Sequence, residues 1–205
     1  LFGGSALADQ ALDAEIINLQ HNWAKANYQT AKDQQEPAFK ALVEQAHQLS
    51  TRYPEASEAM IWEAITLSGY AKSMGPLHPV NALKAAEQAR DLLLTSIKSN
   101  PQALHGSAYT TLGSLYFRVP GWPIGFGDKK KAREYLEKAL QINPTGIDSN
   151  YFYADFLRAQ GEYAQAVTYY QKALQAPGRP GREDADAGRK QEVEEGLKLA
   201  QSKLN

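Results

Sequence analysis

The sequence predicts an all-α fold in which antiparallel helix pairs follow one another along the chain. One stretch reads Tyr109-x2-Leu112-Gly113-x2-Tyr116 and then, after an interruption, Ala132-x3-Leu136-x2-Ala139-Leu140. A second stretch, from Asn150 to Leu174, has a Gly161-Glu-Tyr163 corner and closes with Ala166-x3-Tyr170-x2-Ala173. Prolines follow the presumed second helices at positions 54, 101 and 144. A tandem helical repeat of this kind presents an assembled surface, so it is better suited to holding a partner than to transforming a substrate.

Helix packing explains why these residue types recur. Small residues such as Gly113 and Ala132 let two antiparallel helices approach closely, while Tyr109 and Leu136 fill the space between turns. Pro144 then ends the second helix, because proline lacks the amide donor that the next turn requires.

Two earlier units match the same residue pattern less fully. One has Ala64 at the small position of its first helix, followed by Ala89-x3-Leu93-x2-Ser96-Ile97-x3-Pro101. The other has its second helix outlined by Leu42, Ala46 and Leu49, and the segment around residues 17 to 28 is its expected partner. The whole predicts about four irregular helix pairs.

The pattern resembles the tetratricopeptide repeat family over roughly residues 15 to 176. The resemblance implies a TPR-like helical solenoid that binds partners. The sequence departs from the family in one respect, because Pro54, Pro101 and Pro144 are 47 and 43 residues apart, against a family period of about 34. The extra length falls between the two helices of a unit, at 72–80 and 118–128.

The sequence also predicts how the chain divides. Residues 9–176 form the repeats, 177–183 a Pro/Gly/Arg linker, and 184–205 a capping helix. Solenoids need a terminal helix that covers the last apolar face. The cap's apolar stripe is expected at Val193, Leu197, Ala200 and Leu204.

The sequence of residues 1–8 predicts that the amino end derives from an export signal. Ala6-Leu7-Ala8 fits a signal-peptidase site and is followed by acidic Asp9. On this interpretation residues 1–8 are the remnant of a secretory signal peptide, and the protein is periplasmic. The alternative is that the same apolar residues cap the first helix.

Composition excludes some partners. A net charge of −1 gives no electrostatic case for nucleic acid, and 129–131 is the one lysine run. No apolar stretch approaches the roughly 18 to 20 residues of a membrane span. We therefore expect neither a nucleic-acid partner nor a transmembrane segment.

The segment 119–127, Val-Pro-Gly-Trp-Pro-Ile-Gly-Phe-Gly, is the strongest candidate for a binding element. Its prolines lower the entropy lost on ordering, and its aromatics offer on the order of 150 to 250 Å² of contact each. We expect Trp122 and Phe126 to form a lid or to contact a partner. The alternative is that both rings pack back on the helices.

First helices of such pairs line the concave groove, which nominates six further binding residues. They are Ile61, Ile65, Phe117, Tyr151, Asp155 and Arg158. Tyr151 and Phe117 are the expected anchors, although either could turn into the core between repeats.

Catalysis, metals and cofactors find no support in the sequence. The four histidines are far apart and none has metal-ligand spacing or an evident nucleophile beside it. We therefore expect a non-catalytic scaffold for a protein or peptide partner, without a cofactor.

A second, weaker resemblance points to another class of function. In its inter-helix insertions and its expected export signal, the chain is similar to the periplasmic tetratricopeptide components of TRAP-type transporters. That resemblance implies a small apolar solute and a membrane transporter as partners, with the aromatic loop lining a pocket.

Overall fold

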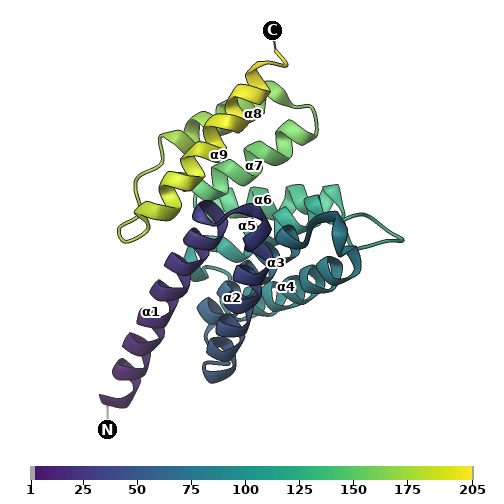
Figure 1. Cartoon of the computed structure of the whole chain (residues 1–205). Helices are drawn as coiled ribbons and strands as arrows, with labels where there is room; N and C mark the ends of the chain where they lie inside the picture. Colours follow the sequence, from purple (N-terminus) through teal and green to yellow (C-terminus); the bar gives the residue numbers. More distant parts are fainter. Residues whose placement is uncertain (1–2, 205) are drawn as a thin grey trace. The chain divides into compact units, whose positions relative to one another are not determined.

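The computed structural model describes the backbone of residues 3–204 and the side chains of residues 9–204. Within the described residues the chain is helical, without a strand, so the predicted all-α fold of successive helix pairs is confirmed (Figure 1). Its contacts gather into two compact units, one up to Asn100 and one from Pro101 onward.

The first unit contains four α-helices, in which α2 packs on α3 and α3 packs on α4. The helices are α1 (Gly3–Ala24), α2 (Lys32–Arg52), α3 (Ser57–Met74) and α4 (Pro79–Ser99), with a π-helical turn η1 (Lys25–Gln29) after α1 and a 3-10 turn η2 (Gly75–Leu77) before α4. Helices α2 and α4, the second helices of their pairs, each end two residues before a proline, as predicted. The intervening residues, Tyr53 and Asn100, leave helical geometry, because a following proline disfavours the α conformation.

The start of the first unit contains an aromatic cluster. Trp23 packs edge-on against Tyr28 at 5.7 Å and against Trp62 of α3 at 6.5 Å between ring centroids. The cluster spans the junction of α1 with the π-helical turn and joins it to α3. The predicted signal-peptide remnant, residues 1–8, lies outside the residues whose side chains are described; the backbone of residues 3–8 is part of α1.

The second unit contains the two helix pairs that match the repeat pattern most fully. Its helices are α5 (Ser107–Arg118), α6 (Lys129–Ile142), α7 (Ile147–Ala159), α8 (Tyr163–Leu174) and α9 (Glu183–Gln201), preceded by a 3-10 segment η3 (Ala103–Gly106). Helix α5 pairs with α6 and α7 with α8, while α7 also contacts α5 and α9. The small and large residues of the repeat pattern are fully buried: Ala132, Leu136, Ala139, Ala166, Tyr170 and Ala173.

The terminal helix α9 packs on α8 and begins at Glu183, next to the predicted start at 184. Val193 and Ala200 of its expected stripe are buried, whereas Leu204 lies beyond the helix end and is exposed. Gly196 permits the close approach, because a Cβ at this position would lie 2.4 Å from Cζ of Tyr170. The helix is therefore fitted against α8 by a small residue, as the helices of each repeat are.

The pairing of α5 with α6 depends on Gly113. A Cβ at this position would lie 2.6 Å from Cγ of Leu136 and 3.1 Å from the backbone oxygen of Ala132. The Leu136 side chain can shift, but the Ala132 carbonyl is part of α6 and cannot move alone. The two helices therefore touch where the sequence places its glycine.

We expect Gly113→Leu to lower the free energy of unfolding by at least about 1 to 3 kcal/mol through overpacking. Urea unfolding followed by circular dichroism measures the change. Gly178→Ala is the matched control, since nothing lies within 4 Å of a Cβ there. An unchanged Gly113→Leu variant would contradict the observed α5–α6 pairing.

Candidate functional site

The loop 119–127, which joins α5 to α6, is ordered by its own backbone. The amide of Gly127 donates to the carbonyl of Pro120 at 2.9 Å, and the amide of Asp128 donates to the carbonyl of Tyr116 at 2.8 Å. Within the loop the amide of Gly125 donates to the carbonyl of Gly121 at 3.2 Å. These bonds close the base of the loop, which extends away from the α5–α6 pair (Figure 1).

The two aromatic residues of the loop have opposite environments. Phe126 packs edge-on against Tyr116 with 5.3 Å between ring centroids and so fixes the loop to α5. Trp122 is 90% exposed and Ile124 is 71% exposed. Phe126 therefore has the structural role that the sequence left open, and Trp122 carries an apolar surface that no described side chain covers.

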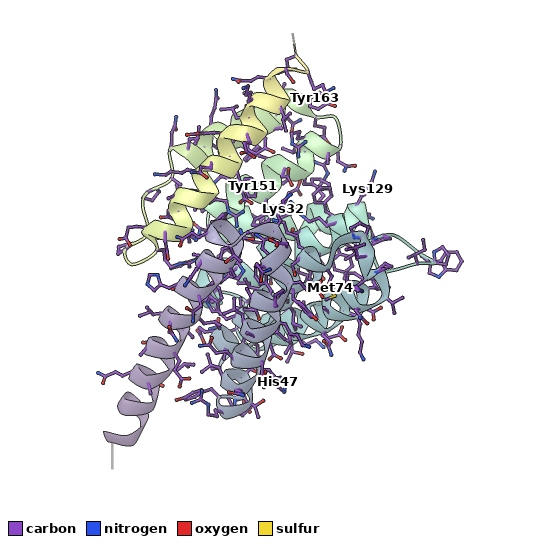
Figure 2. All side chains as sticks on the ribbon, in the orientation of Figure 1. Lys32, His47, Met74, Lys129, Tyr151 and Tyr163 are labelled. Carbon is purple, nitrogen blue, oxygen red and sulfur yellow. The ribbon has the colours of Figure 1, made fainter. Side chains whose placement is uncertain are left out.

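Basic residues stand where the loop meets α6. Asp128 caps the helix: one carboxylate oxygen accepts from the amides of Lys130 at 2.9 Å and Lys131 at 3.0 Å. Lys129, labelled in Figure 2, is the first residue of the helix, and all three lysines are exposed. The carboxylate nearest the loop is thus engaged with backbone amides.

The α5–α7 interface contains a buried carboxylate held by two arginines. Asp155 accepts hydrogen bonds from Arg118 of α5 at 2.5 Å and from Arg158 at 2.6 Å. The Tyr170 hydroxyl also donates to it at 3.3 Å. Burial and then the Asp155 charge raise the pKa of Tyr170. Asp155 and Arg158, both predicted as groove residues, therefore form one ion-pair cluster with Arg118.

The other groove residue of α7, Tyr151, is covered by α9. The guanidinium of Arg189 lies 4.6 Å from the centroid of the Tyr151 ring and 4.7 Å from that of Phe152, a cation–π arrangement. Only 8% of Tyr151 is exposed, and burial raises the pKa of its hydroxyl to about 12. The predicted anchor is thus part of the α7–α9 packing and has no free surface here.

Asp148 joins α9 and the preceding linker to the first turn of α7. It accepts from Arg189 and from Arg179, each at 2.7 Å. Burial alone would raise the pKa of Asp148, but the two guanidinium charges outweigh burial and hold it well below its usual range. Because the folded-state pKa is depressed, the ionised carboxylate stabilises the fold above its unfolded pKa, and this contribution is lost as pH falls.

We expect Asp148→Asn to destabilise the protein more at pH 7 than at pH 3. The contribution is fully present above the unfolded pKa of about 3.9 and shrinks below it. Urea unfolding at the two pH values measures the difference from wild type. Asp91→Asn is the control, since Asp91 is mostly exposed and pairs with its neighbour Arg90. A penalty of equal size at both pH values would contradict the role of the carboxylate charge.

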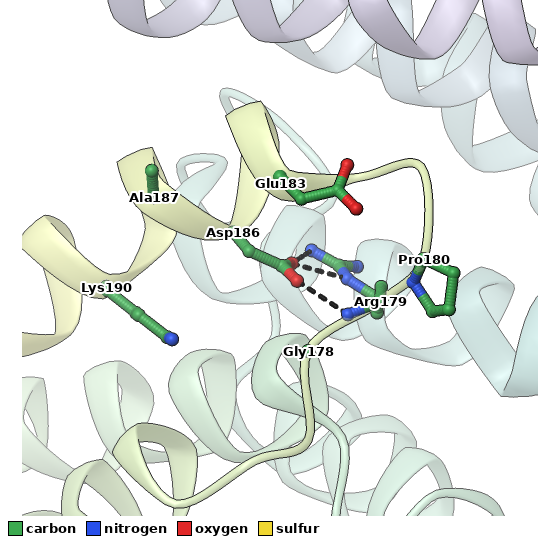
Figure 3. Close-up of a pocket in the computed structure, with 7 residues that line it drawn as sticks. All are labelled: Gly178, Arg179, Pro180, Glu183, Asp186, Ala187 and Lys190. Atoms are coloured by element: carbon green, nitrogen blue, oxygen red, sulfur yellow. Dashed lines mark hydrogen bonds and ion pairs between the residues drawn. The ribbon is translucent and has the colours of Figure 1, made fainter.

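An open hollow of about 520 Å³ lies between the linker and α9. Figure 3 shows its lining: Gly178, Arg179, Pro180, Glu183, Asp186, Ala187 and Lys190. The charged groups on its floor are already engaged, since Arg179 donates to Asp186 from both its side chain and its backbone amide at 2.6 and 2.8 Å. The pairing fixes the linker to α9 and leaves little of this chemistry for a ligand.

The remaining predicted site residues differ in exposure. Ile61 of α3 is fully buried and Ile65 is partly buried. Phe117 of α5 is partly exposed and packs edge-on against Phe156 at 5.6 Å. Of the predicted set, the structure leaves Trp122 on a free surface, Phe117 and Arg158 half-exposed, and Ile61 and Tyr151 inside the helix packing.

A histidine does meet a carboxylate, between α2 and α3. Nδ1 of His47 lies 2.8 Å from Oε1 of Glu63, while the Ser50 hydroxyl donates to the other carboxylate oxygen. Nucleophilic catalysis requires the base to contact the nucleophile. Here the serine contacts the acid, and the His47 side chain is 68% exposed. The arrangement ties α2 to α3 and lacks the order of a catalytic relay.

In the part of the chain that the structure describes, His, Cys, Asp and Glu do not gather in threes to hold a metal ion. None of the described helices combines the length and the apolar character needed to span a bilayer.

Comparisons with known proteins identify the repeat. Residues 124–186, from the loop through α6, α7 and α8 into α9, match the family model described as tetratricopeptide repeat. This segment is therefore similar to tetratricopeptide repeats. Tetratricopeptide proteins are typically non-catalytic scaffolds that bind protein partners. The resemblance to transporter-associated members receives no support from these findings.

Two of the solved structures that are similar to this chain are MamA and PilF. MamA is 18% identical, with a TM-score of 0.43, over 84% of this chain and 92% of that one. PilF of Pseudomonas aeruginosa is 20% identical, with a TM-score of 0.39, over 95% of this chain and 89% of that one. A comparison with curated proteins finds no match.

Proposed function

We propose that this protein is a tetratricopeptide-type scaffold that binds a protein or peptide partner chiefly through the 119–127 loop. One observation carries the proposal: Trp122 is 90% exposed at an ordered loop. Trp122 and Ile124, which is 71% exposed, place two large apolar side chains on one loop. Tryptophan is among the residue types most enriched at the energetic anchors of protein interfaces.

The construction of the loop favours tight contact. Phe126 and the backbone bonds of Gly127 and Asp128 hold the loop in one conformation before a partner arrives. Binding then costs less conformational entropy than ordering a flexible segment does. Trp122 and Ile124 supply the apolar contact, and the loop supplies the rigid support.

The predicted groove residues contribute less than the loop to the proposed contact with a partner. Phe117, Arg118 and Arg158 are partly or largely exposed on α5 and α7 and remain able to touch a partner. Tyr151 and Ile61 are buried, so a partner would reach them only if helices moved. We therefore assign contact to the loop first and to the exposed edge of α5 second.

A small apolar solute is the less supported partner. That function requires Trp122 to line a closed apolar pocket, which buries most of a ligand's surface. The observed exposure of Trp122 does not favour it. The hollow beside α9 has charged walls and lies at the linker.

We expect Trp122→Ala to reduce partner capture by at least about tenfold, since removing an interface anchor costs 2 kcal/mol or more. The thermal midpoint should be unchanged, because the side chain is almost fully exposed. Affinity capture from cells after mild crosslinking, quantified by mass spectrometry, measures the loss.

Leu199→Ala is the matched control, since Leu199 is a large apolar residue on α9 that is 54% exposed. Equal loss in both variants would indicate non-specific apolar adhesion. Undiminished capture by Trp122→Ala at unchanged stability would overturn the loop as the binding element. Recovery of a stoichiometric apolar metabolite in place of a protein would favour the solute.

A further inference from the structure

A second pair of exposed apolar side chains lies in the connection between α3 and α4. Among the described residues the large apolar side chains with the greatest exposure are Trp122 at 90%, Leu77 at 82%, Val80 at 78% and Ile124 at 71%. The next value is 54%. The four therefore form a distinct group, and they belong to just two connections, each between the first and second helix of a pair.

The α3–α4 connection is fixed at both of its ends. Met74, labelled in Figure 2, is buried at its start. Gly75 then turns the chain with φ +55°, a conformation that favours glycine. The 3-10 turn follows, and the amide of Ala82 donates to the carbonyl of His78 at 2.9 Å. Residues 76 to 81 between these fixed points are all exposed.

The two connections share a local design. In one, Leu77 precedes Pro79 by two positions and Val80 follows it directly; in the other, Trp122 and Ile124 lie directly on either side of Pro123. Proline restricts the unfolded chain, so the flanking apolar side chains are presented at a low entropic cost. The sequence pattern of the 119–127 loop thus recurs in the first unit with aliphatic residues.

Both connections also share a charge environment. Residues 64–86 contain no Asp or Glu, and Lys72 and Lys84 within them are exposed. Lys84 follows Val80 by one helical turn, so the two share a face of α4. Residues 92–127 likewise contain no Asp or Glu, and three lysines follow at 129–131. The acidic residue that borders the second segment, Asp128, accepts from the amides of Lys130 and Lys131 as the cap of α6.

We propose that Leu77 and Val80 form a second contact site, and that both connections take a partner segment that is apolar and acidic. This inference rests on the proposed scaffold function. Exposed apolar side chains supply contact area, and the nearby lysines attract carboxylates, which sets the partner's charge. A lipid surface fits less well, because stable interfacial anchoring buries the apolar face of a whole helix or adds a covalent lipid.

The test places a photo-crosslinking amino acid, benzoylphenylalanine, at position 77 or 122 of the full chain in its native cells. Crosslinked peptides are then sequenced by mass spectrometry. We expect protein crosslinks at both positions, to partner peptides rich in Asp and Glu. Lys84→Glu should weaken the crosslink at 77 by at least about threefold, and Lys129→Glu with Lys130→Glu should do so at 122. Lys198→Glu, an exposed lysine of α9, is the charge-reversal control.

The outcomes separate the two proposals. Crosslinks at 122 without any at 77 overturn the second site and leave the proposed function standing. Crosslinks at 77 without any at 122 overturn the role of the loop. Partner peptides without acidic residues, or crosslinks that charge reversal leaves unchanged, overturn the acidic partner. Crosslinks to lipid overturn the protein partner in favour of a membrane surface.

Discussion

Replacing Asp155 with Ala should lower the free energy of unfolding of the second unit by about 3 kcal/mol. Asp155 is 7% exposed and accepts from Arg118, Arg158 and Tyr170. Removing one partner of a buried ion pair typically costs 3 to 5 kcal/mol, because the remaining charges stay desolvated. The lower end applies here, since water reaches the arginine side chains, which are 45% and 31% exposed.

Arg118→Ala is the control that separates charge burial from contact loss. It leaves Asp155 with Arg158 and Tyr170 as partners, and Arg118 itself is largely exposed, so about 1 kcal/mol or less is expected. Urea unfolding followed by circular dichroism gives both values. A loss of about 1 kcal/mol or less in both variants would show that Asp155 takes part in an ordinary surface salt bridge.

The helix pairs could be predicted from the sequence because their signals are local. Ala132 and Leu136 recur at helical spacing and are fully buried, and Asn143 leaves helical geometry just before Pro144. Each signal acts within a few residues: close packing needs a small side chain, and proline ends the turn before it. No distant contact had to be known.

The candidate site could be predicted only in part, because its outcome depends on distant packing. Phe126 and Trp122 look alike in the sequence, yet Phe126 meets the Tyr116 ring and Trp122 meets solvent. The sequence pattern predicts Tyr151 as a groove residue, but Arg189, 38 positions later in the chain, covers its ring. The local sequence pattern does not show which side chain from a distant part of the chain packs against a given residue.

The same limit explains the ion-pair clusters. Asp148 pairs with Arg179 and Arg189, which lie 31 and 41 positions away. The linker therefore has a fixed place beside α7, although its Pro, Gly and Arg content reads as a simple spacer. Pairing of this kind follows from the fold and has no signature in the spacing of the residues.

The presentation of Trp122 depends on a glycine at the base of its loop. A Cβ on Gly127 would lie 1.9 Å from the carbonyl oxygen of Val119 and 2.8 Å from the carbonyl carbon of Pro120. Both neighbours are backbone atoms, so no side chain can move aside. Gly127→Ala should therefore open the base of the loop while Trp122 itself remains in the chain.

We expect Gly127→Ala to lose partner capture by about tenfold or more, as Trp122→Ala does, because the anchor is no longer held in one place. Hydrogen exchange should rise at the amides of residue 127 and Asp128, which bond to Pro120 and Tyr116 in the wild type. Gly121→Ala is the control in the same loop, since its Cβ would meet an ordinary contact of 3.4 Å.

If Gly127→Ala loses amide protection but keeps full capture, Trp122 binds as an isolated side chain and loop rigidity is unnecessary. If it keeps protection, the backbone has found room that the structure does not offer, and the account of the loop base is wrong. Loss of both, with Gly121→Ala unaffected, ties partner binding to the ordered loop and makes Gly127 as necessary to the site as the tryptophan it positions.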